Sequence, residues 1–203
     1  MNRFSTHAWP VKPYEGELHV HGAHSAAQLS VRVWPDFEKL FAPNSGAWRG
    51  CWCMSFQRSG NWSGFTGEQN KKAKLALVKG RKAHGTIVYC GKDPVGWCQF
   101  GPLDELPRIG RRRGYVPTAE NPWMITCLRV VPGHRRAGFA KFAVAESVDA
   151  MKKLGAKTIE AYPYDGKFSA SFMWGGTPHI FEEAGFSKVR RLFKKMWIYS
   201  LNL

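Results

Sequence analysis

The sequence is poor in acidic residues and holds no long apolar run. It has 15 Asp and Glu against 30 Lys and Arg, which gives a formal net charge of +15 at pH 7. This balance favours an anionic ligand, nucleic acid or an acidic surface as partner, and it carries no information about the fold. No apolar segment approaches the roughly 18 residues that cross a bilayer. The first 17 residues lack the continuous apolar core of a secretory signal. We therefore expect a cytoplasmic protein that is not bound to a membrane.

Cysteine is also sparse, and its spacing excludes two classes of site. The five cysteines are odd in number and widely spread, unlike the framework of a small disulfide-rich domain. The pair Cys51 and Cys53 has no second Cys or Cys/His pair at zinc-site spacing. We expect reduced, mostly buried thiols and no metal. The histidines of "HVHGAH" (19–24) could take up a transition metal adventitiously, but we expect them on a loose arm.

Two nucleotide-binding motifs are absent as well. Neither the Walker pattern G-x-x-x-x-G-K-[ST] nor G-x-G-x-x-G occurs, which argues against a nucleotide triphosphatase and a Rossmann site. Internal repeats are also missing. What is present is a composition of 44% hydrophobic and 14% aromatic residues, typical of a folded globule. A chain of 203 residues is long enough for one well-packed domain.

The residue pattern predicts alternating strands and helices after an irregular beginning. We expect an N-terminal extension over residues 1–28 and a domain over 29–203. Within the domain we expect strands at 29–34, 86–90, 95–100, 123–131 and 157–163 and a closing hairpin from the runs 187–191 and 194–203. Helices are expected at 36–40, 68–79 and 139–154, and from Thr177 to Gly185. This order predicts a mixed α+β fold with one parallel crossover.

The stretch "LRVVPGHRRAGFAKFAVAESV" (128–148) places basic residues where a helix begins. Cations oppose the positive end of the helix dipole, so Arg135 and Arg136 are unfavourable there on local grounds. Gly138 and Ala140 remove bulk, and the first-turn amides are free to bind a ligand. The geometry suits a phosphate or pyrophosphate. The alternative is a solvated basic turn.

With the preceding strand, the pattern becomes L-x-V-x-P-x-x-R-x-x-G-x-A, from Leu128 to Ala140. This resembles the acyl-CoA-binding motif of the GNAT acyltransferase superfamily. Downstream, "GAKTIEAYP" resembles the next GNAT strand, and "HIFEEAGF" resembles the short helix that ends in Gly-Phe. Upstream, "CWCM", "KDPVGWCQFGP" and "LPRI" resemble a bacterial-type subgroup, so that the resemblance covers about residues 29–203.

The resemblance implies a splayed, mostly antiparallel sheet of six to seven strands flanked by helices. The central strand would carry a bulge near residues 128–130, and its exposed backbone would hold the pantetheine arm of coenzyme A. The implied coenzyme-binding residues are Leu128, Arg129, Val130, Arg135, Arg136, Ala137, Gly138, Phe139, Ala140 and Lys141. The implied activity is direct transfer of the acetyl group of acetyl-CoA to an amine, with no metal.

Two positions depart from the pattern of the family. Phe181 stands where many members place a tyrosine acid, and Met124 stands where a carboxylate base is common. Glu160 is then the best acid/base candidate, and Tyr162 or Tyr164 could supply a hydroxyl. The alternatives are an ion pair for Glu160 and packing for the tyrosines.

A second function belongs to another class. "RIGRRRGY" (108–115) and "KVRRLFKK" (188–195) combine positive charge with aromatic residues, as single-stranded nucleic acid would require. A GNAT-like module could therefore bind RNA or a protein partner through this surface, with coenzyme A as a structural ligand and no turnover. The alternative is that both runs are solvated faces.

Overall fold

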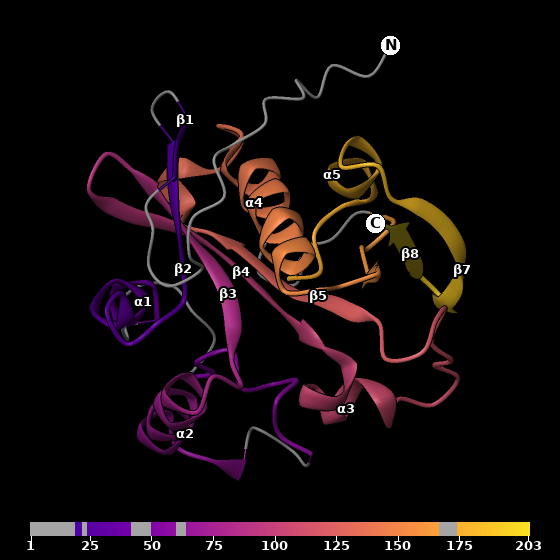
Figure 1. The fold of residues 1–203 in the computed structure, drawn as a ribbon, viewed down its shortest axis with the longest axis horizontal. Coiled ribbons are helices and arrows are strands. Elements are labelled where there is room, and N and C mark those ends of the chain that lie inside the picture. The colour runs from indigo at the N-terminus through magenta and orange to yellow at the C-terminus, as the bar shows by residue number, and fades with distance from the viewer. Residues whose placement is uncertain (1–18, 22–23, 42–49, 60–63, 167–173) are drawn as a thin grey trace.

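The computed structural model describes residues 19–21, 24–41, 50–59, 64–166 and 174–203. Strands and helices alternate through the chain, as Figure 1 shows. The elements are β1 (His19–His21), β2 (His24–Gln28), α1 (Trp34–Phe41), α2 (Gly67–Lys79), β3 (His84–Cys90), β4 (Asp93–Pro102), α3 (Pro107–Gly110), β5 (Trp123–Val130), α4 (Phe139–Lys153), β6 (Thr158–Ala161), α5 (Pro178–Glu183), β7 (Ser187–Phe193) and β8 (Met196–Asn202). Among the described helices, none is long and apolar enough to cross a membrane.

The described strands form one eight-stranded sheet in the order β1-β2-β3-β4-β5-β6-β8-β7. Every neighbouring pair in it is antiparallel except β5 and β6, which are parallel and are joined through α4. The predicted mixed α+β fold with a mostly antiparallel sheet is therefore confirmed. The sheet has more strands than the six to seven expected, because β1 and β2 lie where an extension was predicted.

The start of the domain differs from the prediction in two ways. Residues 24–28 form β2, in which Ala26 and Ala27 are buried against β3. The strand predicted at 29–34 is wrong: a turn leads into α1, and Val31 is 54% exposed. Leu29, Val33 and Trp34 are buried whereas Val31 is exposed, because the segment turns into α1 and does not form a pleated strand.

Helices cover both faces of the sheet. Alternate residues of the central strands point to opposite faces, so each strand contributes side chains to both helix layers. On β4, Cys98 and Phe100 belong to the core cluster that contains α4 and α5. Trp97 points to the other face, where its ring centroid lies 4.8 Å from that of Phe37 in α1. Gly85 on β3 leaves room for this indole, since a Cβ there would lie 2.1 Å from it.

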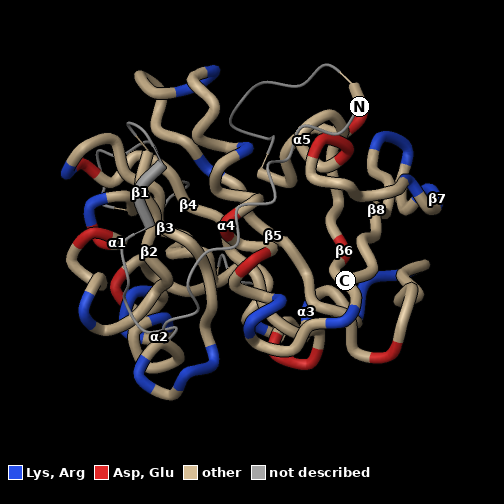
Figure 2. Tube along the Cα trace, turned by 45° about the horizontal axis from the view of Figure 1, so that its top comes forward, with Lys and Arg blue, Asp and Glu red and all other residues tan. Residues whose placement is uncertain are grey.

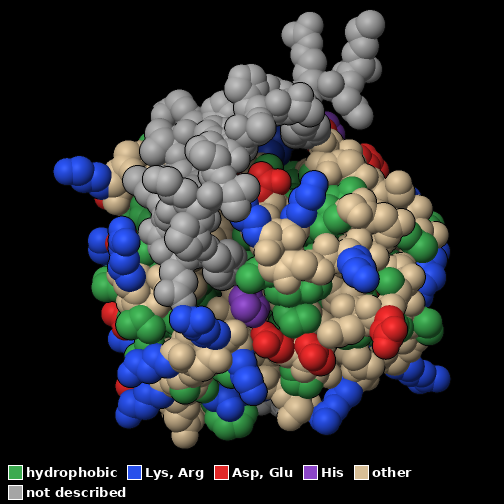
Figure 3. Space-filling model, viewed as in Figure 1, with side chains coloured by type: hydrophobic (Ala, Val, Ile, Leu, Met, Phe, Trp, Pro, Cys, Tyr) green, Lys and Arg blue, Asp and Glu red, His purple; other side chains and the backbone are tan. Residues whose placement is uncertain are grey.

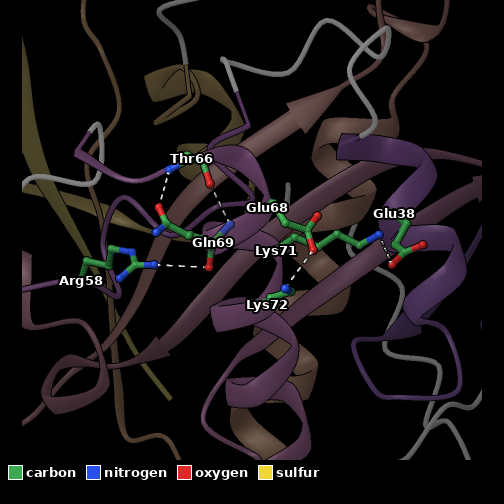
Figure 4. A network of polar contacts seen from close by, with 7 residues as sticks. All are labelled: Glu38, Arg58, Thr66, Glu68, Gln69, Lys71 and Lys72. Carbon is green, nitrogen blue, oxygen red and sulfur yellow. Dashed lines mark hydrogen bonds and ion pairs between the residues drawn. The ribbon is translucent and has the colours of Figure 1, made fainter.

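The start of α2 is fixed by side-chain hydrogen bonds (Figure 4). The Thr66 hydroxyl accepts from the Gln69 amide, and the Gln69 side chain accepts from the Thr66 amide, which is a capping box. An ion pair of 2.9 Å between Lys71 and Glu38 joins α2 to α1. Asn70 of α2 accepts a hydrogen bond from Arg58 and donates one to the Gly50 carbonyl, and these two bonds hold α2 next to the segment 50–59, which contains the CWCM sequence.

The sheet opens between β5 and β6. Their parallel pairing ends at Ile125 and Ala161, while β5 continues to Val130 alongside β4. The register of β4 and β5 shifts at the same level, where Thr126 is the extra residue of a bulge. The bulge predicted near residues 128–130 thus lies two residues earlier. Residues 128–130 pair regularly with β4, and their other backbone edge faces the opening.

Candidate functional site

The turn before α4 is built to leave backbone amides unpaired. After β5, a short 3₁₀ turn at Pro132–His134 leads to Arg136, which has φ +65°, and then to Gly138, which has φ +85°. Gly138 is the N-cap of α4 and makes no side-chain capping hydrogen bond to the first turn of the helix. The amides of that turn have no partner within the helix, so they are free for an external acceptor.

Space and positive charge surround these amides. A Cβ added at Gly138 would meet nothing within 4 Å, and residues 135–138 are exposed. The Nε of Arg135 donates to the Val130 carbonyl at 3.2 Å, which holds the side chain close to the end of β5. The turn can therefore bind an anion through backbone amides and guanidinium groups together.

Lys141 in the first turn of α4 points to α5. Its Nζ lies 2.5 Å from an Oε atom of Glu183, and His179 lies 3.0 Å from the other Oε atom. The hydrogen bond from Lys141 lowers the pKa of Glu183 below its ordinary value. The ion pair between Lys141 and Glu183 therefore links α4 to α5.

His24, which was expected on a loose arm, lies in β2 and contacts the turn. Its Nε2 lies 3.1 Å from the Ala137 carbonyl oxygen, and its ring centroid lies 4.2 Å from that of Phe139. Nothing local in "HVHGAH" predicts this contact across 113 residues. Among the residues that the structure describes, no group of three or more His, Cys, Asp or Glu could hold a metal ion.

The open edge of β5 is already hydrogen-bonded by the chain. The Leu128 amide donates to the Trp174 carbonyl at 2.7 Å, and the Val130 carbonyl accepts from Arg135. Gly175 and Gly176 follow, and a Cβ at Gly175 would lie 2.4 Å from the Tyr162 carbonyl. The Arg129 side chain lies on the face of the sheet that α1 covers, where Nη1 donates to the Leu40 carbonyl at 2.8 Å.

Glu160 lies on β6 directly beside Met124 of β5 and is fully buried. One carboxylate oxygen accepts from the Tyr115 hydroxyl at 2.9 Å. The other accepts from the amide of Thr118 at 2.5 Å and from its hydroxyl at 2.6 Å. Glu160 therefore anchors the segment that follows α3. These partners lie more than 40 residues away in the sequence, and no local pattern predicts them.

Tyr162 and Tyr115 continue this buried network. Both hydroxyls point to the Met124 sulfur, at 3.7 and 3.8 Å. Burial, followed by neighbouring charge and hydroxyl groups, raises the pKa of Tyr162 well above 10, and burial with Glu160 raises the pKa of Tyr115. Both tyrosines therefore keep their protons at neutral pH. Tyr164 is only partly buried, and burial also raises its pKa.

Phe181 is fully buried in α5, as expected for a packing residue. Its ring meets Phe186 edge-on with centroids 5.4 Å apart. A Cβ at Gly176 would lie 3.0 Å from the ring, so this side chain fills the space under the Gly175–Gly176 pair.

Comparison with known proteins identifies the fold. The family model described as "Acetyltransferase (GNAT) family" matches residues 35–170. No curated protein matches the chain. The solved structures include a protein of the GNAT family from Desulfovibrio desulfuricans, which is 15% identical with a TM-score of 0.54 over 89% of this chain and 99% of that chain.

Two further solved structures show the same fold at similarly low sequence identity. The acetyltransferase from Thermus thermophilus is 16% identical, with a TM-score of 0.52 over 91% of this chain and 99% of that chain. A structure from Salmonella typhimurium, described with its cofactor acetyl-CoA, is 10% identical, with a TM-score of 0.50 over 90% of this chain and 95% of that chain. Since the family model covers more than half of the sequence, the chain belongs to the GNAT acetyltransferase family.

Proposed function

We propose that the protein is an N-acetyltransferase that transfers the acetyl group of acetyl-CoA directly to an amine. The observation that carries this proposal is the turn before α4, where uncapped amides, open space at Gly138 and two exposed arginines occur together. A pyrophosphate fits these features, because it is an anion that accepts several hydrogen bonds at once.

The positions of the turn and of the open edge of β5 indicate which residues would bind each part of acetyl-CoA. The amides of 136–141 and the side chains of Arg135 and Arg136 would bind the pyrophosphate. The open edge of β5 at residues 128–130 would bind the pantetheine arm, and the Leu128 amide would then exchange the Trp174 carbonyl for it. When bound, acetyl-CoA supplies an acetyl group activated as a thioester.

The chain itself would orient the amine and remove its proton. We assign Glu160 as the final proton acceptor and the hydroxyls of Tyr115 and Tyr162 as the relay to it. The distance of 2.9 Å between the Tyr115 hydroxyl and Glu160 supports this route. Burial raises the pKa of both tyrosines, so each hydroxyl keeps its proton between transfers. Glu160 and Tyr162 are both fully buried, so Tyr115, which is 9% exposed, is the member of the relay closest to solvent.

Acetyl-CoA binding at the turn can be tested by thermal denaturation. At about 100 times its Kd, acetyl-CoA should raise the melting temperature by roughly 5–10 °C. Gly138→Glu should abolish this rise, because its carboxylate enters the space for the phosphates. Gly155→Glu is the matched control: Gly155 ends α4 with φ +88° and open surroundings, so the backbone cost is similar. A rise that persists in Gly138→Glu would place the ligand elsewhere.

The relay can be tested by turnover with an amine panel. Glu160→Gln should lower kcat by about 10²-fold, and Tyr162→Phe should lower it less, while the thermal shift by acetyl-CoA is retained. Full activity of a folded Glu160→Gln protein would remove Glu160 from the reaction and leave it as the anchor of residues 115–118.

A second candidate function, binding of single-stranded RNA with coenzyme A as a structural ligand, is favoured by one observation. The two basic runs meet: the Arg112 guanidinium lies 4.9 Å from the Phe193 ring centroid, and Arg190 donates to the Val116 carbonyl. Figure 1 shows the segment after α3 reaching β7, and Figure 2 marks Lys and Arg near α3 and on β7. Phe193 and Val189 remain 42% and 48% exposed on this edge strand.

RNA binding and amine turnover, measured on the same protein, distinguish the two candidate functions. Anisotropy of a labelled single-stranded RNA should show binding whose affinity falls with salt if the basic surface has this role, and replacing Arg190 and Arg191 by Gln should reduce the slope. Such binding without acetyl transfer to any amine would favour the second candidate. Turnover with an amine, together with RNA binding that does not respond to these substitutions, would favour the enzyme.

A further inference from the structure

A buried lysine on α2 has no carboxylate beside it among the described residues. Lys74 is fully buried, and its Nζ donates to the Cys53 carbonyl at 3.3 Å and to the Gln57 side-chain oxygen. A buried ammonium needs a negative partner, because neutral acceptors compensate only part of its lost hydration. The charged or ionisable groups that act on it electrostatically are the thiols of Cys51, Cys53 and Cys127.

Cys53 is the thiol with the strongest support for a negative charge. Its sulfur accepts a hydrogen bond from the Trp97 indole nitrogen at 3.1 Å, and it also contacts the thiol of Cys127. Burial alone would raise the pKa of Cys53, but the bond from Cys127, the Lys74 ammonium and the Trp97 N–H together lower it. These contacts favour the thiolate of Cys53 over its thiol, with the Lys74 ammonium as the nearby positive charge.

Cys127 holds the proton in this pair. It lies on β5 opposite Gln99, one residue after the bulge at Thr126, and it is partly exposed. Its hydrogen bond to Cys53, followed by burial, raises its pKa well above that of a free thiol. The Gln99 side chain donates to the Cys53 carbonyl at 3.0 Å, which holds Cys53 directly over this part of the sheet.

The other two cysteines lie in different surroundings. Cys98 points to the opposite face of β4, and burial raises its pKa to about 12. Cys90 lies at the end of β3, packed against the same α4 cluster. Neither has a lysine or an indole N–H arranged around its sulfur among the contacts described. The two thus serve as internal reference cysteines that lack these contacts.

We propose that Cys53 and Cys127 are a site of oxidation by hydroperoxides, at which the two thiols are converted to a disulfide. The Cys53 thiolate attacks the peroxide O–O bond, forms an S–O bond and releases hydroxide or an alkoxide, which takes up a proton from solvent to leave as water or an alcohol. The Cys127 sulfur then attacks the resulting sulfenic acid, forms the S–S bond and releases water, its proton leaving with the hydroxyl group. Two thiols are oxidised by two electrons in total, and one hydroperoxide is reduced.

The experiment is a non-reducing tryptic map of the folded full chain after exposure to hydrogen peroxide. Cleavage after Lys and Arg places Cys51 and Cys53 on residues 50–58 and Cys127 on residues 114–129, while Cys90 and Cys98 fall on two other peptides. We expect a linked pair of peptides 50–58 and 114–129 that is two hydrogens lighter than their sum. Cys51→Ser should keep this link, and Cys53→Ser should remove it.

Two further variants test the order of the two oxidation steps and the role of Lys74 in their rate. In Cys127→Ser, the sulfenic acid should persist and be trapped by dimedone on peptide 50–58. Lys74→Met should slow formation of the link about three- to tenfold, because the thiolate fraction falls more than the nucleophilicity of the thiolate rises. Lys72→Met on the exposed side of α2 is the matched control and should leave the rate unchanged.

Three results would overturn the proposal. They are a link between Cys51 and Cys53 alone, oxidation of Cys90 or Cys98 at the same rate as Cys53, and an unchanged rate in a folded Lys74→Met protein. If Lys74→Met fails to fold, dimedone labelling of Cys127→Ser decides the question, since a reactive thiolate must still be labelled on peptide 50–58 before the reference cysteines.

Discussion

At the scale of single residues, the buried ammonium of Lys74 makes the stability of the fold depend on pH. Burial lowers the pKa of Lys74 from 10.5 to about 8. Between these values the unfolded chain holds a proton that the folded chain has released, so this group makes the free energy of unfolding rise with pH. Below pH 8 the folded protein carries the whole cost of the buried charge.

Lys74→Met should therefore stabilise the protein at neutral pH by up to about 3 kcal/mol, since each unit of pKa shift corresponds to about 1.4 kcal/mol. The gain should shrink as the pH rises from 8 towards 10.5. Urea denaturation of both proteins under reducing conditions across this range measures the difference. A gain that is the same at every pH would mean that folding does not shift the pKa of Lys74.

Phe181 gives a second prediction at the same scale. Phe181→Leu should lower the free energy of unfolding by about 1 kcal/mol, because the ring loses its edge-on contact with Phe186 in a fully packed core. The pH dependence of turnover should not change, because phenylalanine has no proton to give. Phe193→Leu on exposed β7 is the control, with an expected change under about 0.5 kcal/mol. An altered pH profile in Phe181→Leu would contradict a pure packing role.

At the scale of elements, the capping box of α2 should measurably stabilise the fold. Thr66→Ala removes the hydroxyl that accepts from Gln69 and should cost about 1 kcal/mol in thermal or urea denaturation. Thr177 is the matched control, because it is the N-cap of α5 but its side chain makes no capping hydrogen bond. Equal losses in Thr66→Ala and Thr177→Ala would show that the box in Figure 4 does not stabilise α2.

The elements with strong local patterns were predictable. The β3–β4 hairpin, the strand β5, the helix α4 and the closing β7–β8 hairpin all occur where the sequence predicts them. In contrast, β2 reads "HSAAQ", whose Ala, Ser and Gln have little strand preference, and it forms because its neighbour β3 buries it. The run 108–115, for which no helix or strand is predicted, overlaps the short helix α3, which begins at a proline.

Only the part of the site that lies within one continuous stretch of sequence could be predicted. The turn at residues 135–140 combines motif and geometry in one stretch, and the structure leaves its amides uncapped. The partners of Glu160 and of Cys53 come from other elements, so no spacing reveals them. Lys74 is an intermediate case: buried Asn70, Lys74 and Val78 lie four residues apart on α2, and this period could have marked it as facing the core.

At the scale of the whole molecule, the positive charge is spread over the surface. Figure 3 shows Lys and Arg side chains around the rim of one face, including the region of α2 and the side of β7. The long-range attraction of such a surface for an anion such as coenzyme A is screened by salt within about 10 Å at 0.1 M. Short-range amide contacts at the turn are screened much less.

The hydrogen bond of 2.7 Å from the Leu128 amide to the Trp174 carbonyl has a consequence for the speed of binding. A ligand that needs this amide must wait until the chain releases it. The observed association rate should then rise with acetyl-CoA concentration and level off at the opening rate. Trp174 reports the event, since its ring lies 5.2 Å from Phe56 and 5.4 Å from Tyr164. Stopped-flow fluorescence measures the curve, and a strictly linear dependence would show that the amide is free before the ligand arrives. A plateau would mean that the measured affinity is the intrinsic one reduced by the fraction of molecules that are open.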